Sequence, residues 1–266
     1  MKGIITLIAI TFFNQNVFSQ FKTEKTFEYS SYVGDSFAIY TSLPKDFNEK
    51  KIYKTVYYLD ANLKSGKQLR ELISTSKYDT IISNCIFIGI GHIGNYHVLR
   101  RRDFIQPSID GRDTVSKHKN YGNAEKFYTF LKKELMPSIN KKFSTNTDSC
   151  FIIGHSLGGL FGFYCLFKNE SLFTKYFALS PALWINNYSI YKFNQLDTKL
   201  DKKQVLYFTA GSKETVNKIL KGTNEAEIFF KQKSYKQLLF EYDIWKGKTH
   251  NSEVILSLSK ILEQKL

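Results

Sequence analysis

Cysteine is scarce in this sequence, and its positions argue against a disulfide. Only three of the 266 residues are cysteine, an odd number. Cys150 and Cys165 stand at opposite ends of a strand–turn–helix pattern, where a bridge would have poor geometry. No group of Cys and His residues has the spacing of a metal site. We therefore expect no disulfide, no metal ion and no cofactor.

Long apolar runs are also lacking, apart from a short one at the N-terminus. Lys2 is followed by a mostly apolar run over residues 3–13, which is too short to span a bilayer, and then by polar residues up to Gln20. This order is typical of a secretory signal peptide; a buried N-terminal strand is the alternative. The sequence therefore predicts a signal peptide at residues 1–19, a mature chain at 20–266 that is periplasmic or secreted, and no stable membrane insertion.

Acidic residues are outnumbered, so the chain is strongly basic. Lys and Arg number 38 against 24 Asp and Glu, which gives a formal net charge of +14. Such a balance can indicate nucleic-acid or membrane binding. Here the lysines are scattered, no basic run is interleaved with aromatic residues, and no nucleic-acid-binding motif appears. We expect a solvated basic surface, no nucleic-acid partner, and a monomer or weak dimer.

Hydrophobic residues, in contrast, are abundant and follow an α/β order. They make up 42% of the chain, and aromatic residues 16%, which indicates a globular protein. Strands are expected at 23–32, 35–43, 53–59, 85–91, 151–153, 176–180, 204–209 and 238–244. Helices are expected at 63–77, 124–143, 159–167, 213–233 and 251–265, and a long polar loop at 92–120. Because strands and helices alternate without a repeat or linker, we predict one α/β domain with a mostly parallel, doubly wound sheet and an N-terminal antiparallel hairpin.

The stretch around Ser156 has the pattern of a nucleophile elbow. An apolar strand, Phe151–Ile153, leads into Gly154–Gly158, which fits G-x-S-x-G, and an apolar helix follows. In such a turn the serine backbone is strained, and Cβ atoms at the flanking glycine positions would collide with the turn or the helix. A chance match is the alternative, but the strand and helix around the motif argue against it. Ser156 is therefore the predicted nucleophile.

A serine hydroxyl needs a base, and the base needs an orienting acid. In α/β-hydrolases the acid and then the histidine follow the serine, and His250 is the only histidine after Ser156. Glu214 follows the penultimate strand, as the acid should, whereas Asp243 lies inside the last strand and Asp197 comes too early. We predict Ser156, His250 and Glu214 as catalytic residues. A solvated carboxylate at a helix start is the alternative for Glu214.

An oxyanion hole needs two N–H donors beside the serine, and both can come from the backbone. The first is expected from Leu157, at the start of the helix behind the elbow. The second is expected from Ala61 or Asn62, because these residues follow the strand at 53–59 and lie in the loop that supplies this donor in α/β-hydrolases.

Three consecutive arginines stand before Asp103 in the long polar loop. We expect Arg100 to pair with Asp103 and hold the loop, which leaves Arg101 and Arg102 free to contact an anionic or polyhydroxyl ligand. This loop and the segment around Trp184 are expected to form the rim of the cleft. We therefore predict substrate-binding residues among Arg100, Arg101, Arg102, Asp103 and Trp184.

These motifs together resemble the putative esterase family of α/β-hydrolases, which includes esterase D, periplasmic enterochelin esterases and bacterial feruloyl esterases. The matching stretches span nearly the whole mature chain: Tyr58–Asn62, Arg100 with Asp103 and Pro107, Gly122–Phe127, Phe130–Pro137, Gly154–Gly159, Ser180–Trp184, Gly211–Glu214 and His250. The resemblance implies an α/β-hydrolase fold with Ser156 as nucleophile and His250 as base. It supports Glu214 less, since siderophore esterases of this family can use a Ser–His pair. Ala61 departs from the family, whose members usually carry Gly there.

The expected activity is that of an exported serine carboxylic-ester hydrolase that works through an acyl-enzyme. Plentiful aromatic residues and a diffuse cationic surface favour acyl or feruloyl esters of carbohydrate, or similar small esters, as substrates. A catecholate trilactone siderophore is the alternative substrate. A catalytically silent binding protein on the same fold and an acyl transferase are alternative functions.

Overall fold

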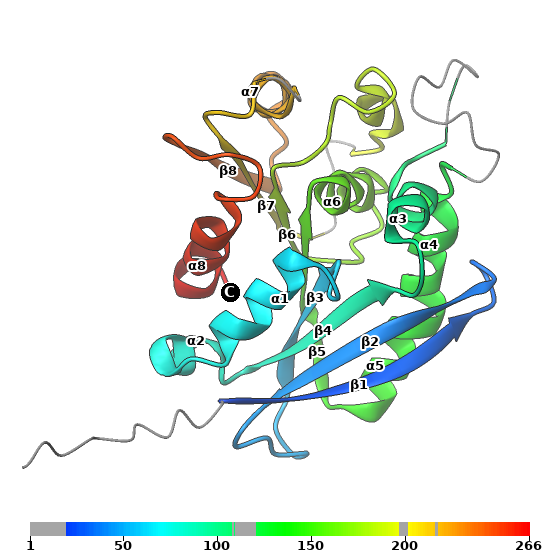
Figure 1. Cartoon of the computed structure of the whole chain (residues 1–266), viewed down its shortest axis with the longest axis vertical. Coiled ribbons are helices and arrows are strands. Elements are labelled where there is room, and N and C mark those ends of the chain that lie inside the picture. Colours follow the sequence, from blue (N-terminus) through cyan, green and yellow to red (C-terminus); the bar gives the residue numbers. More distant parts are fainter. Residues whose placement is uncertain (1–19, 108, 110–120, 197–201, 216–217) are drawn as a thin grey trace, which may run out of the picture.

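One eight-stranded sheet runs through the protein, with helices on both of its faces (Figure 1). The computed structural model describes residues 20–107, 109, 121–196, 202–215 and 218–266, so the predicted signal peptide lies outside the described residues. The strand order is β1-β2-β4-β3-β5-β6-β7-β8. The strands are β1 Phe21–Ser30, β2 Asp35–Pro44, β3 Tyr53–Leu59, β4 Cys85–His92, β5 Thr145–His155, β6 Lys175–Leu179, β7 Gln204–Gly211 and β8 Leu238–Trp245.

The N-terminal hairpin is antiparallel, as predicted. β1 pairs with β2 from Ser30 opposite Asp35 to Phe21 opposite Pro44, and Gly34 turns the chain between them with a φ of +74°. β2 pairs antiparallel with β4, and all further neighbours pair in parallel, which confirms the mostly parallel sheet. The carboxyl ends of the parallel strands meet at one edge, so the loops that follow β3, β5, β7 and β8 are brought together there.

Helices cover the two faces of the sheet. α1, α2 and α8 pack on one face, and α4 to α7 pack on the other (Figure 1). The helices are α1 Lys64–Ile73, α2 Asp79–Ile82, α3 Tyr96–Phe104, α4 Ala124–Phe130, α5 Met136–Lys142, α6 Leu157–Phe167, α7 Ile219–Lys233 and α8 Val254–Gln264, with short 3-10 segments at Ser76–Tyr78 and Ser189–Phe193. In the part of the chain that the structure describes, no helix is long and apolar enough to cross a membrane.

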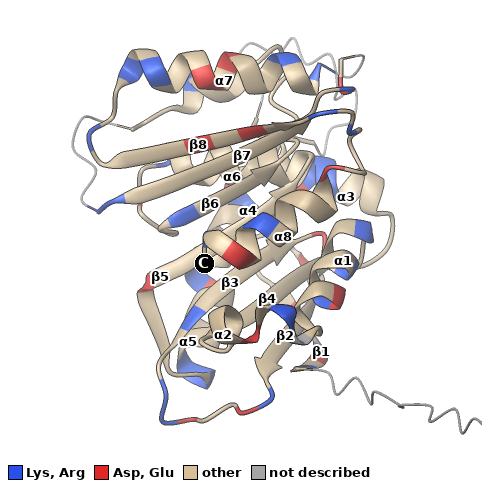
Figure 2. Ribbon diagram, turned by 90° about the vertical axis from the view of Figure 1, so that its left-hand side faces the viewer, with Lys and Arg blue, Asp and Glu red and all other residues tan. Residues whose placement is uncertain are grey.

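The aromatic residues are concentrated in the core. Around α6, the ring centroids of Phe127 and Phe161 lie 5.1 Å apart, and those of Phe163 and Phe208 lie 5.9 Å apart. All four side chains are fully buried. Lys and Arg, in contrast, are spread over several helices and strand ends, with Asp and Glu among them, on the face that Figure 2 turns to the viewer. Much of the aromatic content of the sequence is therefore used for packing.

Several elements differ from the sequence prediction. β5 starts at Thr145 rather than at 151, α1 ends at Ile73 rather than at 77, and α7 starts at Ile219 rather than at 213. The segment at 92–120, predicted as a loop, contains a helix, α3. It was not predicted because its apolar residues form no regular stripe along one face. The buried residues of α3 are Asp103 and Phe104, at its C-terminal end. The predicted helix at 124–143 is continuous but widens into a π turn at Leu131–Leu135. Pro137 stands two residues after this turn, and its ring and missing N–H disfavour regular α-helical hydrogen bonds one turn back along the helix.

Candidate active site

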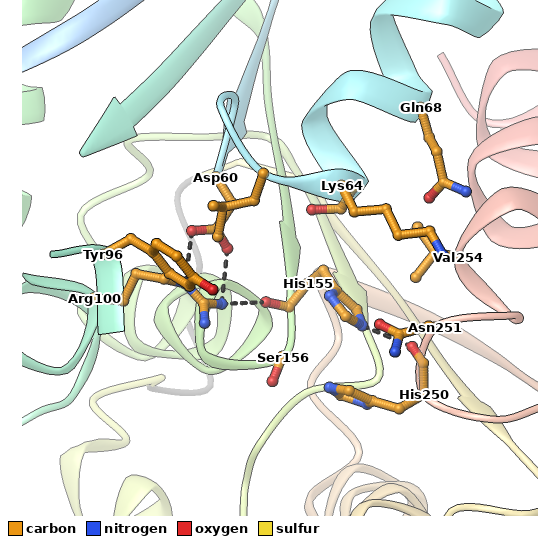
Figure 3. Close-up of a pocket in the computed structure, with 12 residues that line it drawn as sticks. Asp60, Lys64, Gln68, Tyr96, Arg100, His155, Ser156, His250, Asn251 and Val254 are labelled. Carbon is orange, nitrogen blue, oxygen red and sulfur yellow. Dashed lines mark hydrogen bonds and ion pairs between the residues drawn. The ribbon is translucent and has the colours of Figure 1, made fainter. Parts of the chain in front are cut away.

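A cavity of about 290 Å³ opens at the carboxyl edge of the parallel strands (Figure 3). It is lined by the loop after β3, by α1, α3 and the elbow, and by the loop before α8: Asp60, Leu63, Lys64, Ser65, Gln68, Tyr96, Arg100, His155, Ser156, His250, Asn251 and Val254. Ser156 and His250 therefore share one cavity. Lys64, Gln68 and Tyr96 were not predicted from the sequence, although their positions after β3 and β4 place them at the edge where α/β proteins bind ligands.

The backbone at Ser156 has the strained conformation that the motif predicts. Its φ of +59° and ψ of −115° are unusual for a residue with a Cβ, and its N–H donates to the Leu179 carbonyl at 2.9 Å. A Cβ on Gly154 would lie 2.2 Å from the Gly158 carbonyl oxygen, so only glycine fits there. Gly158 was expected to be equally constrained, but a Cβ there would make ordinary contacts at 3.4 Å. Gly159, where a Cβ would lie 3.1 Å from the Pro181 Cα, is the tighter position.

One of the two predicted candidates for the second oxyanion donor is wrong. The Ala61 N–H donates to the Ile90 carbonyl at 3.0 Å and is buried between β3 and β4, so it does not face the cavity. The Asn62 N–H has no hydrogen-bond partner among the described residues and remains the candidate. Leu157 is the first residue of α6, where the helix leaves N–H groups without intrahelical partners.

Glu214 and His250 are joined by a short hydrogen bond. Nδ1 of His250 lies 2.6 Å from Glu214 Oε2, and Glu214 is only 3% exposed. Burial alone would raise the pKa of Glu214, but hydrogen bonds from His250, from the Ser180 hydroxyl and from the Gly211 N–H outweigh it and lower the pKa below its ordinary value of 4.5. The carboxylate is therefore charged and can hold the His250 ring with its proton on Nδ1.

His155, which occupies a variable position of the elbow motif, was not predicted as a site residue from the sequence. Its Nε2 lies 2.9 Å from the His250 carbonyl oxygen, and the two imidazole centroids are 4.4 Å apart. Burial, and then the neighbouring His250, lower the pKa of His155 to about 3. The ring is therefore neutral near pH 7, and its Nε2–H donates to the backbone of the loop that carries the predicted base.

Ser156 and His250 face the same space but are not bonded to each other. Within the described part of the chain, no hydrogen bond joins Ser156 Oγ to the His250 ring; both side chains border the cavity in Figure 3. Hydrogen bonds between nucleophile and base are often loose in unliganded enzymes and tighten when substrate binds.

The arginine pairs differ from the prediction. Arg100 does not pair with Asp103; its Nε and Nη2 donate to the two oxygens of Asp60 at 2.7 and 2.8 Å, and Nη2 also lies 3.3 Å from the His155 carbonyl oxygen (Figure 3). The reason is that α3 places Arg100 toward the loop after β3, where Asp60 is buried. Arg100 thus borders the cavity, but a fixed carboxylate balances its charge.

Asp103 instead pairs with Arg102, which was predicted to be free. Arg102 Nε and Nη2 donate to Asp103 at 2.7 and 2.8 Å, and Nη1 donates to Asp35 at 2.8 Å. His92 Nε2 lies 2.9 Å from Oδ2 of the same buried carboxylate, the oxygen that also accepts from Arg102 Nη2. Arg101 donates to the His97 carbonyl at 2.7 Å within α3. Arg102 and Asp103 therefore tie α3 to β4 and to the start of β2, and neither lines the cavity.

Trp184 also lies away from the cavity. It is half-buried and packs against the core cluster that includes α6 and α7, and it is not among the cavity-lining residues. Of the five predicted substrate-binding residues, the structure thus brings only Arg100 to the cavity. In the described ranges, no group of three or more His, Cys, Asp or Glu side chains is placed to hold a metal ion.

Known proteins resemble this chain over most of its length. The sequence model of the family described as "Putative esterase" matches residues 30–253. The ferri-bacillibactin esterase BesA of Bacillus subtilis is 26% identical over 241 residues, which cover 85% of this chain and 83% of the relative. A siderophore enterobactin esterase of Emericella nidulans is 31% identical over 153 residues, 53% of this chain and 50% of that protein. The crystal structure of the BES protein from Bacillus cereus superposes with a TM-score of 0.78 at 27% identity, covering 99% of this chain and 97% of that one.

Proposed function

The chain belongs to the putative esterase family, and on this premise we propose that it is a serine carboxylic-ester hydrolase with Ser156, His250 and Glu214 as its catalytic residues. One observation carries the proposal. A charged Glu214 bonds His250 at 2.6 Å beside the cavity into which the strained elbow presents Ser156. This arrangement contains the nucleophile, the base and the orienting acid of a serine hydrolase.

The proposed reaction runs through an acyl-enzyme. Ser156 Oγ attacks the ester carbonyl carbon while His250 Nε2 accepts the hydroxyl proton, and the imidazolium then gives that proton to the leaving alcohol. Water, deprotonated by the same ring, then attacks the acyl carbon; the bond to Ser156 Oγ breaks, the imidazolium returns the proton to Oγ, and the acid is released. The Leu157 N–H at the start of α6 and the Asn62 N–H are the proposed donors to the oxyanion. Glu214 stays ionised throughout and stabilises the imidazolium.

Replacement of the nucleophile tests this mechanism. Ser156→Ala should lower turnover of p-nitrophenyl acetate by more than about 10³-fold, with an unchanged melting curve. Labelling of the native protein by a fluorophosphonate probe should occur at Ser156 and be lost in the variant. Full activity of Ser156→Ala would refute the mechanism, and a native protein that resists the probe would favour a silent binding protein. Product analysis with an added alcohol separates hydrolysis from acyl transfer.

The proposed substrate is an ester of a siderophore rather than of a carbohydrate. Both curated relatives described above are siderophore esterases by name. The aromatic residues that favoured a sugar-stacking site in the sequence are largely part of the core. Lys64, on α1, borders the cavity and forms no ion pair among the described residues, whereas Arg100 is neutralised by Asp60. A ferric catecholate complex carries negative charge, and an uncompensated cation at the cavity would attract it.

A kinetic panel tests the substrate. Enterobactin-type trilactone, methyl ferulate, acetylated xylan and p-nitrophenyl acetate are compared at low and high salt, with Lys64→Ala and, as a matched control, Lys67→Ala. Lys67 is exposed on the same helix but does not line the cavity. We expect kcat/KM for the ferric trilactone to be highest, to fall with salt, and to fall about three- to tenfold only in Lys64→Ala. A preference for acetylated xylan or methyl ferulate would overturn the substrate.

The proposal includes export. The apolar run at residues 3–13, preceded by Lys2, supports a signal peptide that is removed at about residue 19, which would leave a periplasmic or secreted enzyme. Intact-mass measurement on protein from its native source tests this directly. A mature mass that includes residues 1–19 would contradict it.

A further inference from the structure

A second buried carboxyl group, Glu253, lies behind Glu214 at the start of α8. Its side chain is fully buried, and among the described residues it forms no ion pair with a cation. Its partners are hydroxyl groups. Ser180 Oγ lies 2.9 Å from Oε1, and Thr209 Oγ1 and Ser257 Oγ lie 2.9 and 2.5 Å from Oε2. An isolated charge in such a site is costly, so burial favours the neutral acid.

Ser180 connects the two carboxyl groups. Its Oγ lies 2.6 Å from Glu214 Oε1 and 2.9 Å from Glu253 Oε1. Two hydrogen bonds along this row of three oxygens require two protons, and the Ser180 hydroxyl supplies one. The second proton must stand on a carboxyl group, because two carboxylates would leave one of the contacts as a repulsion between oxygen lone pairs.

Glu253 is the better site for that proton. Glu214 also accepts the Gly211 N–H and faces His250, and these donors lower its pKa. For Glu253, burial is the largest influence and raises the pKa above 4.5. Hydrogen bonds to the surrounding hydroxyl groups oppose this rise, and the charge of Glu214 adds to it. Among the described residues, Tyr207 on β7 is also influenced by the charge of Glu253, but its hydroxyl donates to Asp243. The start of α8 favours an anion, yet such an effect is usually below about 1 kcal/mol.

We propose that Glu253 is a protonated carboxylic acid that donates to Ser180 and, through the Ser180 hydroxyl, fixes Glu214 in the orientation that serves His250. Oε1 of Glu214 is then occupied by Ser180 and Gly211, and Oε2 is left for Nδ1 of His250. Among the described residues, Glu253 has no hydrogen bond to the His250 side chain and does not line the cavity, so it is a positioning residue. The inference rests on the Ser156–His250–Glu214 mechanism proposed above.

The arrangement predicts a loss of activity at high pH. Once Glu253 ionises, Ser180 can donate to only one of two carboxylates, and a second buried negative charge stands behind Glu214. The wild-type kcat/KM should therefore fall on the alkaline side. Stability follows the same sign: because the pKa in the folded state is raised, the contribution of the neutral acid is complete below pH 4.5 and is lost as the pH rises through the folded-state pKa.

Glu253→Gln tests the proposal, because the amide can donate to Ser180 and accept from Thr209 and Ser257 but cannot ionise. For Glu253→Gln we expect kcat/KM for p-nitrophenyl acetate at pH 7 to stay within about threefold of the wild-type value. The fall in kcat/KM and the loss of stability that ionisation of Glu253 causes at high pH should both be absent from this variant. In Glu253→Ala, kcat/KM should fall by more than about tenfold. Glu263→Gln, on the exposed side of the same helix, is the matched control. A Glu253→Gln variant as inactive as Glu253→Ala, or one that keeps the wild-type alkaline fall, would overturn the proposal.

An infrared measurement decides the protonation state without turnover. The carbonyl stretching band of a buried carboxylic acid should be present at pH 7 in wild type, Glu263→Gln and Ser156→Ala, and absent in Glu253→Gln. If the same band persists in Glu253→Gln, the neutral acid is not Glu253. Ser156→Ala leaves the hydrogen bonds among Glu214, Ser180 and Glu253 unchanged. If the serine mechanism is wrong, this variant keeps its activity; if the Glu253 assignment is wrong, the variant lacks the infrared band. The two failures are therefore distinguishable.

Discussion

Replacement of Glu214 by Gln should remove catalysis through the tautomer of His250. Oε1 of Glu214 accepts two donors, the Gly211 N–H and the Ser180 hydroxyl, each at 2.6 Å. In the variant the amide oxygen must take this place, since the amide nitrogen cannot accept. The NH2 group is then directed at His250 Nδ1, where a carboxylate oxygen stood at 2.6 Å.

An NH2 group only donates, so Nδ1 must become the acceptor and the ring proton must move to Nε2. In that tautomer His250 cannot take the proton of Ser156. A wrong tautomer of this kind costs a serine hydrolase about 10⁴-fold in kcat, which corresponds to roughly 5 kcal/mol of activation free energy. KM should change little, because Glu214 does not line the cavity.

The assay is steady-state hydrolysis of p-nitrophenyl acetate by purified Glu214→Gln, with circular dichroism melting to verify the fold. Glu263→Gln, which removes an exposed charge on α8, controls for the loss of one carboxylate. A loss of less than about tenfold in a folded variant would refute the reasoning, and the site would then operate as a Ser–His pair without an orienting acid.

Three further predictions concern the free energy of unfolding. The pKa of His155 is lowered from 6.5 to about 3, so the stability that its neutral form contributes is complete above pH 6.5 and is lost as the pH falls. In urea titrations, the free energy of unfolding of wild type should therefore fall between pH 7 and pH 4.5 by about 2–3 kcal/mol more than that of His155→Gln. Gly154→Ala should lower the free energy of unfolding by about 3 kcal/mol through overpacking, whereas Gly162→Ala, in open space within α6, should raise it by about 0.5–1 kcal/mol; equal effects would contradict the elbow geometry. Asp103→Asn should cost about 3–5 kcal/mol in the same assay because it leaves Arg102 without its buried partner, and a cost below about 1 kcal/mol would show that the pair is not structural.

The sequence predicts those parts of the protein whose determinants are local. The apolar run before Ser156 and the glycines around it specify a strand and a tight turn regardless of the rest of the chain. The bounds of β3 at Tyr53–Leu59 were predicted to the residue, because the segment is rich in aromatic and β-branched side chains. Glu214 and His250 could be selected because the order of residues along a doubly wound sheet is itself a constraint.

What the sequence could not predict depends on which strand lies beside which. Ala61 was predicted as an oxyanion donor, but β4 lies beside β3, and the carbonyl of Ile90 on β4 accepts the Ala61 N–H. The pairing of Arg100 with Asp60 joins residues forty positions apart, and only the placement of α3 against the elbow decides it. Sequence proximity favoured Asp103 instead, but that carboxylate is held by Arg102 and by His92 of β4.

The contact between the His155 ring and the His250 carbonyl also bears on how the enzyme reaches its active form. The two residues are 95 positions apart, and the pair closes the site between β5 and the loop after β8. Pairings of such separation are made late, because the entropy of closing the intervening chain must be lost first. During synthesis, the residues of the elbow leave the ribosome well before His250, so the elbow can form before the base is present. During refolding, the return of esterase activity should therefore lag behind the return of strand signal and mark the docking of the last loop and α8.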